Sequence, residues 1–452
     1  MRSLMALALA GVSTLATMAP TQAQQAPAGL SKIETIVVLY MENRSFDHLF
    51  GTFPGANGLA NAGDAAIQVD ETGKPYATLP APLDLRKKPP VPYEKLPAAI
   101  PNGYFRLDEH YKLSDQLGSL VHAFYQQQDQ INGGKMNRFA LTSDAKGYTM
   151  GVYDGSSLKM WEYAKKYTLA DNFFHAAFGG SFLNHLWLVC ACTPVYPNAP
   201  ANIVAKVDAQ GRMIEDGFVT PDGYGVNTME PVGGPFAADT KKERLLPVQT
   251  MTTIGDRLSE KGIDWRWYSG GWNEADGGTL KPGTPFSYHH QAFAFFDRFQ
   301  KGKPDRAKHI KDLEDFLVDI DKGTLPPVVF YKPRAGINQH PSNSNVLDSD
   351  AHTADLIARL EKSPQWGKMA VIVTYDENGG FWDHVAPPKR DRWGPGTRVP
   401  TIVASPFARK GYVDHTQYDT TSVLKLIEER HGLAPLTDAD AKANSLTAAF
   451  EF

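Results

Sequence analysis

Residues 370–384 have the sequence AVIVTYDENGGFWDH, and the rest of the chain can be interpreted around them. The first six residues form an apolar, β-branched run, which is typical of a strand buried on both faces of a sheet. The run ends at Asp376 and Glu377, and two glycines follow shortly afterwards. Ligands in open α/β sheets bind beyond the carboxyl ends of the strands, so this pattern predicts a ligand-holding loop. Turn chemistry alone is equally consistent with two solvated carboxylates at this point.

A second stretch has the same design and favours the ligand-holding interpretation. Residues 36–51, IVVLYMENRSFDHLFG, form another apolar run that ends in an acid and an amide, Glu42 and Asn43. Hard cations bind carboxylate and amide oxygens. Two buried strands that end in such pairs therefore predict one shared cation site.

Length and composition limit the class of protein. A chain of 452 residues is long enough for one large α/β domain or two ordinary ones. Its hydrophobic content of 42% and aromatic content of 11% allow a sizeable core. The net charge of −4 and the absence of a basic run in the sequence argue against a nucleic-acid partner.

The first 23 residues resemble a secretory signal peptide. Arg2 supplies the positive start, residues 4–15 the apolar core, and Thr21, Gln22 and Ala23 a small-residue cleavage site. The apolar run is short for a membrane span, so cleavage is favoured over anchoring. We expect a periplasmic or secreted protein with no transmembrane segment after cleavage, in which residues 24–452 form a single domain.

The two cysteines, Cys190 and Cys192, are separated by one residue. A disulfide between them would close a tight ring with strained geometry. The sequence therefore predicts two buried thiols.

Strand and helix patterns alternate along the chain. They predict an α/β fold with a mostly parallel sheet covered on both faces. Strands are expected at 33–41, 168–174, 264–269, 327–331, 370–375 and 399–405. Helices are expected within 111–132 and at 157–167, 252–262, 309–320, 351–362 and 418–431. Two stretches rich in Pro and Gly, at about 52–110 and 196–248, are expected to be long surface excursions.

Ser181 follows Gly179 and Gly180 and begins an apolar, helix-forming stretch. This order predicts a strand-to-helix turn, where backbone N–H groups and the helix N-terminus favour an anion. A plain N-cap role for Ser181 is equally consistent with the local sequence. The pattern differs from the G-x-S-x-G elbow of α/β hydrolases.

These segments together contain the groups that phosphoryl transfer needs. Three carboxylates and an amide can hold a metal ion, and a metal lowers the pKa of a hydroxyl nucleophile. Histidines nearby can bind an anion or protonate a leaving alcohol. Of the adjacent His289 and His290, only one ring would point into a site if both lay in a strand.

The motifs resemble the bacterial phosphoesterase family, which joins secreted acid phosphatases with haemolytic and non-haemolytic phospholipases C. The resemblance extends from about residue 33 to about residue 431. Its motifs are residues 36–51, GGSFLNH at 179–185, TIGDRLSEKGIDWRWY at 253–268, HPS at 340–342 and TYDENGGFWDHVAPP at 374–388. The resemblance implies an alkaline-phosphatase-like, three-layer α/β/α fold, one divalent metal and a hydroxyl nucleophile that is transiently phosphorylated.

Roles carry over from the family residue by residue. The implied metal ligands are Glu42, Asn43, Ser181, Asp376 and Glu377. The implied catalytic residues are Ser181, as nucleophile, with His122, His290 and His340. The implied substrate-binding residues are Asn184, His185 and His289. Gly180 stands where the family often has proline, which should loosen the turn. Oxygen ligands favour Mg²⁺, Mn²⁺ or Ca²⁺, although Zn²⁺ also accepts carboxylates.

The predicted function is a secreted, metal-dependent phosphoesterase of the acid phosphatase type that hydrolyses phosphomonoesters through a phosphoserine at Ser181. Many phospholipase C members continue into added C-terminal domains, whereas this sequence stops near residue 452, which favours the phosphatase branch. The alternative is a phospholipase C that hydrolyses phospholipid phosphodiesters. An exported protein that binds phosphate or a phospholipid head group without turnover is a third hypothesis.

Overall fold

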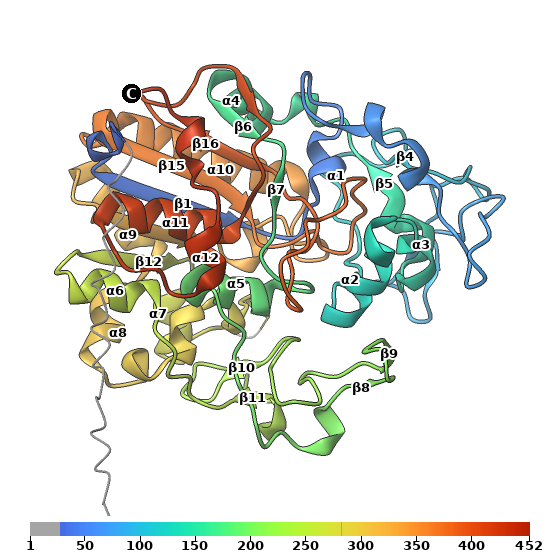
Figure 1. Ribbon diagram of the computed structural model, residues 1–452, viewed down its shortest axis with the longest axis horizontal. Helices are drawn as coiled ribbons and strands as arrows, with labels where there is room; N and C mark the ends of the chain where they lie inside the picture. Colours follow the sequence, from blue (N-terminus) through green and yellow to red (C-terminus); the bar gives the residue numbers. More distant parts are fainter. Residues whose placement is uncertain (1–27, 282) are drawn as a thin grey trace, which may run out of the picture.

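The computed structural model describes residues 28–281 and 283–452 (Figure 1). The predicted signal peptide lies outside the described residues. An eight-stranded sheet runs through the molecule in the order β13-β12-β14-β1-β15-β16-β6-β17. Neighbouring strands are parallel except that β16 is antiparallel to both β15 and β6. The predicted α/β fold with a mostly parallel sheet is therefore confirmed.

The strands of this sheet are short and mostly buried. They are β1 (Thr35–Met41), β6 (Thr168–Ala170), β12 (Trp265–Ser269), β13 (Ile310–Asp312), β14 (Val328–Lys332), β15 (Met369–Tyr375), β16 (Thr401–Ala404) and β17 (Tyr412–Asp414). Every residue of the adjacent strands β1 and β15 is buried. Their β-branched, apolar sequences fit the centre of a sheet that is covered on both faces.

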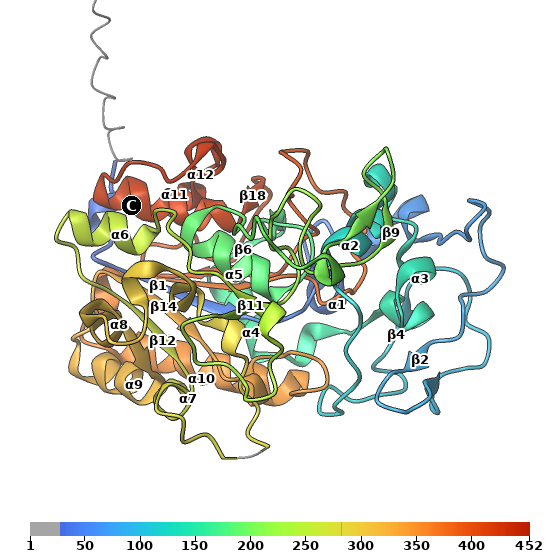
Figure 2. The same cartoon turned by 90° about the horizontal axis from the view of Figure 1, so that it is seen from below.

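Helices lie on both faces of the sheet, as Figure 2 shows. One layer contains α5 (Ser181–Cys190), α6 (Ile254–Glu260) and α11 (Thr420–His431); the other contains α4 (Lys159–Lys166), α9 (Leu313–Lys322) and α10 (Val346–Lys362). The remaining helices are α1 (Phe46–Phe50), α2 (Phe124–Ile131), α3 (Phe139–Thr142), α7 (Trp272–Asp276), α8 (Pro304–His309) and α12 (Asp438–Lys442). Helix α11 begins at the Asp419 cap and ends at the left-handed Gly432, as its sequence signals require.

The two excursions contain only short elements. They carry β2 (Leu83–Asp84), β3 (Val91–Pro92), β4 (Phe105–Arg106), β8 (Lys206–Val207), β9 (Met213–Glu215), β10 (Glu230–Pro231) and β11 (Leu245–Leu246). The first excursion joins α2, α3 and β5 (Gly151–Val152) in a lobe beside the sheet (Figure 1). Within the described residues, no helix is long and apolar enough to cross a bilayer.

Two local predictions were wrong. The helix expected at 309–320 is divided, because residues 310–312 pair with β12 as strand β13 and Asp312 then caps α9. The strand expected at 168–174 is broken between β6 and β7 (Phe173–Phe174). The helix expected within 111–132 is confirmed as α2, which occupies the last third of that range.

The cysteine prediction was also wrong, because Cys190 and Cys192 form a disulfide. Cys190 is the last residue of α5, and Ala191 adopts a left-handed conformation with φ 47°. This reversal of the chain brings the two cysteine Cα atoms to 5.1 Å, within the usual range for a disulfide. The helix end therefore provides a geometry that the spacing alone did not suggest.

Candidate active site

The two acidic motifs lie side by side at the carboxyl end of the sheet. Met41 pairs with Tyr375 in the parallel ladder of β1 and β15, so Glu42 and Asp376 leave adjacent strands at the same level. The Asp376 amide donates a hydrogen bond to the Met41 carbonyl at 3.0 Å, which continues the ladder into the loop. Asn43 has a left-handed backbone with φ 57°, and its amide donates to Asp376 Oδ1 at 3.0 Å. The register of two strands therefore brings residues more than 300 positions apart into one site.

Ser181 is the first residue of α5 and lies against these motifs. Its Oγ is 3.2 Å from Glu42 Oε2, 3.4 Å from Asn43 Oδ1 and 3.4 Å from Glu377 Oε1. All four side chains are buried. The structure thus gathers the five predicted metal ligands, with Asp376 as the fifth, around one place.

The turn before Ser181 is held by a neighbour on the same helix. Asn184 Nδ2 donates to the carbonyls of Ala177, Gly179 and Gly180, and Asn184 Oδ1 accepts from the Ala177 amide. Gly179 has φ 88°, and a Cβ there would lie 2.7 Å from the Phe124 nitrogen. The side-chain amide of Asn184, predicted to bind substrate, is therefore engaged in shaping the turn before Ser181.

Burial changes the protonation of the carboxylates. It raises the pKa of Asp376 to about 7, and the neighbouring Glu42 carboxylate acts in the same direction. Burial and the Asp376 charge raise the pKa of Glu377 well above its usual range. Among the described residues, Asp376 Oδ2 has no hydrogen-bond donor. An unpartnered buried carboxylate oxygen within an all-oxygen set fits a divalent cation, which would supply the missing charge.

Lys332, at the end of β14, was not predicted as a site residue. Its side chain is buried, and its Nζ contacts Glu42 Oε1 and donates to the Met41 carbonyl at 3.3 Å. Strand β14 is the other neighbour of β1, so its carboxyl end opens on the same site. Ligands in open α/β sheets bind beyond the carboxyl ends of the strands. The same reasoning, applied to the predicted strand at 327–331, would have identified Lys332 as a site residue.

The predicted histidines approach the site from two sides. His122 Nδ1 donates to the Leu120 carbonyl at 2.6 Å, which leaves Nε2 to accept from Asn43 Nδ2 at 3.3 Å. The rings of His122 and His340 have centroids 5.9 Å apart. Burial lowers the pKa of both, that of His340 to about 3. Both residues are partly exposed, so they lie at an opening to solvent beside the buried ligands.

On the other side, His185 and His290 stack with centroids 4.6 Å apart and an interplanar angle of 4°. His290 Nε2 is 3.1 Å from Glu42 Oε1, and His185 Nδ1 donates to the Ser181 carbonyl at 2.7 Å. Together with Glu42 these histidines form a buried triad whose ligand atoms lie within 4.8 Å of one another. Burial lowers the pKa of both histidines well below the usual range, which keeps the rings neutral and able to bind an anion or a metal.

His289 lies beside the site, against the ring of His290. The adjacent pair belongs to the short 3₁₀ turn Tyr288–His290 and not to a strand, so the expectation that only one ring can point inward does not apply. The two ring centroids are 4.5 Å apart.

A buried ion-pair network joins the two acidic motifs behind the site. The Arg398 guanidinium contacts Asp383 Oδ1 at 2.8 Å and Asp47 Oδ1 at 3.1 Å, and His384 Nδ1 lies 2.6 Å from Asp47 Oδ2. Asp47, Asp383 and His384 have the spacing of a metal triad. Arg398 already supplies a cation to both carboxylates, so we assign this cluster to the packing of the loops that carry the ligands.

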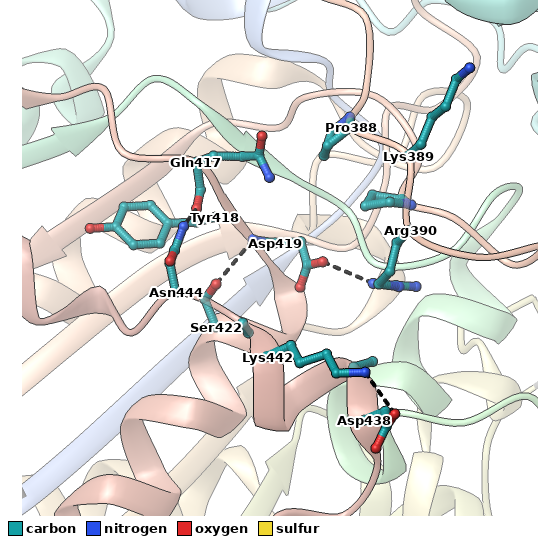
Figure 3. Close-up of a pocket in the computed structure, with 13 residues that line it drawn as sticks. Pro388, Lys389, Arg390, Gln417, Tyr418, Asp419, Ser422, Asp438, Lys442 and Asn444 are labelled. Atoms are coloured by element: carbon teal, nitrogen blue, oxygen red, sulfur yellow. Dashed lines mark hydrogen bonds and ion pairs between the residues drawn. The ribbon is translucent and has the colours of Figure 1, made fainter.

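A separate cavity of about 170 Å³ lies at the start of α11 (Figure 3). Its acids are already paired, Asp419 with Arg390 at 2.8 Å and Asp438 with Lys442 at 2.8 Å. None of the predicted site residues lines it. It is therefore distinct from the site around Ser181.

Comparisons with known proteins identify a family and several relatives. The Phosphoesterase family matches residues 33–434. Phospholipase C A of Mycobacterium tuberculosis (strain ATCC 25618 / H37Rv) is 27% identical over 468 residues, covering 94% of this chain and 78% of that protein. The non-hemolytic phospholipase C of Pseudomonas aeruginosa is 24% identical and covers 98% of this chain and 62% of that protein. The non-specific phospholipase C1 of Arabidopsis thaliana is 25% identical, covering 91% and 70%.

Among solved structures, a protein of the alkaline phosphatase superfamily from Vibrio parahaemolyticus is similar with a TM-score of 0.37 and 11% identity. The match covers 74% of this chain and 73% of that one.

Proposed function

Because this chain belongs to the Phosphoesterase family, we propose that it is a metal-dependent phosphodiesterase of the phospholipase C type that acts through Ser181. Family membership makes it a hydrolase of phosphoric ester bonds. The observation that supports Ser181 as nucleophile is its place at the start of α5, with three ligand-type oxygens within 3.4 Å of its hydroxyl. The relatives reported above, which match more than 90% of this chain, are phospholipases C and favour the diester alternative over the monoester that we predicted.

We propose that Glu42, Asn43, Ser181, Asp376 and Glu377 hold one divalent cation, with Mg²⁺, Mn²⁺, Ca²⁺ and Zn²⁺ as candidates. When bound, the cation would acidify the Ser181 hydroxyl and neutralise charge on the phosphoryl oxygens. The chain's own residues prepare for this. Lys332 fixes the Glu42 carboxylate, and the Asn43 and Glu377 amides bind Asp376 Oδ1, which leaves its other oxygen free for the cation.

In the first chemical step Ser181 Oγ attacks phosphorus, and the bond from phosphorus to the leaving alcohol breaks. The Ser181 proton is directed toward Glu42 Oε2, 3.2 Å away. The departing alkoxide takes up a proton from water at the opening beside His122 and His340, since burial keeps the histidine rings of the site neutral. Water then attacks the phosphoserine, which releases the phosphorylated head group and restores the Ser181 hydroxyl. For a phospholipid the first product would be diacylglycerol.

The test compares three substrates under one condition: p-nitrophenyl phosphate, p-nitrophenyl phosphorylcholine and phosphatidylcholine vesicles. We expect hydrolysis of the diesters, with a higher kcat/KM than for the monoester, and loss of activity on addition of a chelator. Turnover of the monoester alone would instead identify an acid phosphatase. No hydrolysis of any of the three substrates, with phosphate binding retained, would identify a binding protein.

We also propose that residues 1–23 are a cleaved signal peptide and that residues 24–452 form one catalytic domain, which acts in the periplasm or outside the cell. The charge, apolar length and small-residue end of that segment support export. N-terminal sequencing of the protein from the periplasm and the medium tests this, since a start at residue 24 is expected and an intact start at Met1 would contradict it.

A further inference from the structure

The second excursion brings a carboxylate to the histidines of the site. Glu230 Oε1 lies 3.6 Å from His289 Nδ1, although 59 residues separate them in the chain. The side chains of Glu230 and His289 are only 17% and 18% exposed, so water screens the electrostatic interaction between them less than it would at the open surface. A surface excursion thus places an acid beside a histidine that packs against the site.

The backbone that carries Glu230 is well anchored. Strand β10 pairs in parallel with β11, with Glu230 opposite Leu245 and Pro231 opposite Leu246. Met229 and Leu246 are buried in the main core, so the pair is tied to it. Figure 1 shows β10 and β11 below α5, the helix that begins with Ser181. The position of Glu230 is therefore determined by packing, as a positioning residue requires.

Within the described part of the chain, each of the two side chains has a buried polar atom without a hydrogen-bond partner: the facing Nδ1 of His289 and the second carboxylate oxygen, Oε2, of Glu230. Buried polar atoms are normally satisfied, and a small rotation of either side chain would bring Glu230 and His289 Nδ1 into hydrogen-bond distance. The His289 ring also packs against His290, whose Nε2 is 3.1 Å from Glu42 Oε1. A carboxylate that orients His289 therefore also supports the ring that contacts a predicted metal ligand.

We propose that Glu230 is a positioning residue of this active site, which binds Nδ1 of His289 and turns the opposite edge of the ring toward the phosphoryl group. Carboxylates that hydrogen-bond a functional imidazole in this way fix its tautomer and orientation. The proposal rests on the proposed function for its kinetic consequence, and on geometry alone for the Glu230–His289 contact.

The same carboxylate lines a cavity of about 410 Å³ together with Phe218, Glu243 and Arg244. Arg244 stacks over Phe218 at 3.6 Å from the ring centroid and so closes this wall. Glu243 lines the same cavity, and among the ion pairs of the described residues His289 is joined to Glu230 and not to Glu243, so Glu243 provides a matched control for loss of a carboxylate at this place.

The kinetic test is a double-mutant cycle of Glu230→Ala and His289→Ala on the full mature protein, with Glu230→Gln and Glu243→Ala beside it. We expect Glu230→Ala to lower kcat/KM for p-nitrophenyl phosphorylcholine roughly 10–100-fold. The double variant should be no slower than His289→Ala, because Glu230 acts only through that ring. Glu230→Gln keeps a hydrogen-bond acceptor and should recover part of the activity, and Glu243→Ala should match the wild type.

Two kinetic outcomes would overturn the proposal: wild-type kinetics for Glu230→Ala, or losses that multiply in the double variant. A loss of kcat/KM that is accompanied by a lower Tm, and that Glu230→Gln does not relieve, would also overturn the proposal, since that result indicates a purely structural role.

A second measurement is independent of turnover, so that failure of the proposed function can be distinguished from failure of this contact. Protein labelled with ¹⁵N only at histidine should show a hydrogen-bonded Nδ1–H resonance that disappears in His289→Ala and shifts in Glu230→Ala. The same resonance should stay in place in Glu243→Ala. If Glu230→Ala leaves the His289 signals unchanged, the contact does not form in solution and the proposal fails, whatever the enzyme hydrolyses.

Discussion

The buried ammonium group of Lys332 contacts the buried carboxylate of Glu42, the first predicted metal ligand of the chain. The two oxygens of that carboxylate face different partners. Oε1 faces Lys332 and His290, while Oε2 faces the Ser181 hydroxyl at 3.2 Å. Lys332 therefore fixes the rotation of a group that the proposed nucleophile depends on.

Replacement of Lys332 by methionine should lower kcat roughly 10–100-fold, because Glu42 loses the partner that orients it. Lys332→Arg should not restore activity, since a planar guanidinium does not fit a buried site shaped for an ammonium group. Steady-state kinetics on a chromogenic diester, with Tm measured in parallel, check this. Full activity of the methionine variant would show that Glu42 is oriented without Lys332.

Replacement of Ser181 by alanine should abolish turnover, by about four orders of magnitude or more, because it removes the hydroxyl proposed as nucleophile. Metal content should fall little, since four other ligands remain. Hydrolysis assays and acid trapping of a phosphorylated protein measure both aspects, and the exposed Ser156→Ala serves as control. Undiminished hydrolysis, or a phosphoprotein that survives the Ser181 change, would refute the serine mechanism.

A chelator should remove activity, and a divalent cation should restore it. Asp376→Asn should lose both metal and activity, because it removes a charge from the oxygen that lacks a donor. Elemental analysis of purified protein, with the exposed Asp355→Asn as matched control, tests this prediction. An Asp376→Asn variant with the wild-type metal content would exclude Asp376 from the ligand set.

Arg398→Met should destabilise the protein by about 3–5 kcal/mol, because it leaves Asp47 and Asp383 as buried charges without their cation. Arg359, whose partner Asp321 is exposed, is the matched control, and its loss should cost no more than about 1 kcal/mol. Urea unfolding followed by tryptophan fluorescence gives both values. Equal effects of the two changes would contradict the structural role assigned to this network.

Asp350 should make the free energy of unfolding depend on pH. Its carboxylate accepts the Lys159 and Met160 amides at 2.8 and 3.1 Å, and burial raises its pKa to about 6. A folded-state pKa above the unfolded value of about 4 means that the folded state binds the proton more tightly. The stabilising contribution is then complete below about pH 4 and declines as the pH rises to about 6.

Asp350→Asn does not titrate, so the unfolding free energy of the wild type should fall relative to that of the variant by about 3 kcal/mol in total from well below pH 4 to well above pH 6. Urea unfolding at several pH values measures the difference, and the exposed Asp348→Asn is the control. Parallel pH profiles for wild type and Asp350→Asn would contradict the prediction.

Much of the site could be predicted because its signals are local. Glu42 and Asp376 each end an apolar strand, and parallel strands place their carboxyl ends at one edge of a sheet. Ser181 follows two glycines and opens a helix, so its position at a helix N-terminus is also encoded nearby. Caps such as Asp419 and Gly432 were correctly located for the same reason.

Other features had no local signal. Glu230 lies in a stretch without periodic pattern, and nothing in the sequence around it indicates that it faces His289. Residues 310–312 fit the apolar pattern of a helix, yet they form strand β13 because they pair with the edge strand β12. The spacing of the two cysteines argued against a disulfide. The structure contains one because the left-handed conformation of Ala191 brings Cys190 and Cys192 together.

The sequence by itself determined the α/β architecture, the carboxylates at the strand ends and the turn before Ser181, because burial periodicity and turn chemistry act over a few neighbouring residues. Only the tertiary structure decided the partners: Lys332 with Glu42, Arg398 with Asp47 and Asp383, and Glu230 with His289. Such pairs depend on sheet order and on packing between distant segments. The sequence around a charged residue does not indicate whether that residue will be buried beside an opposite charge or exposed to water.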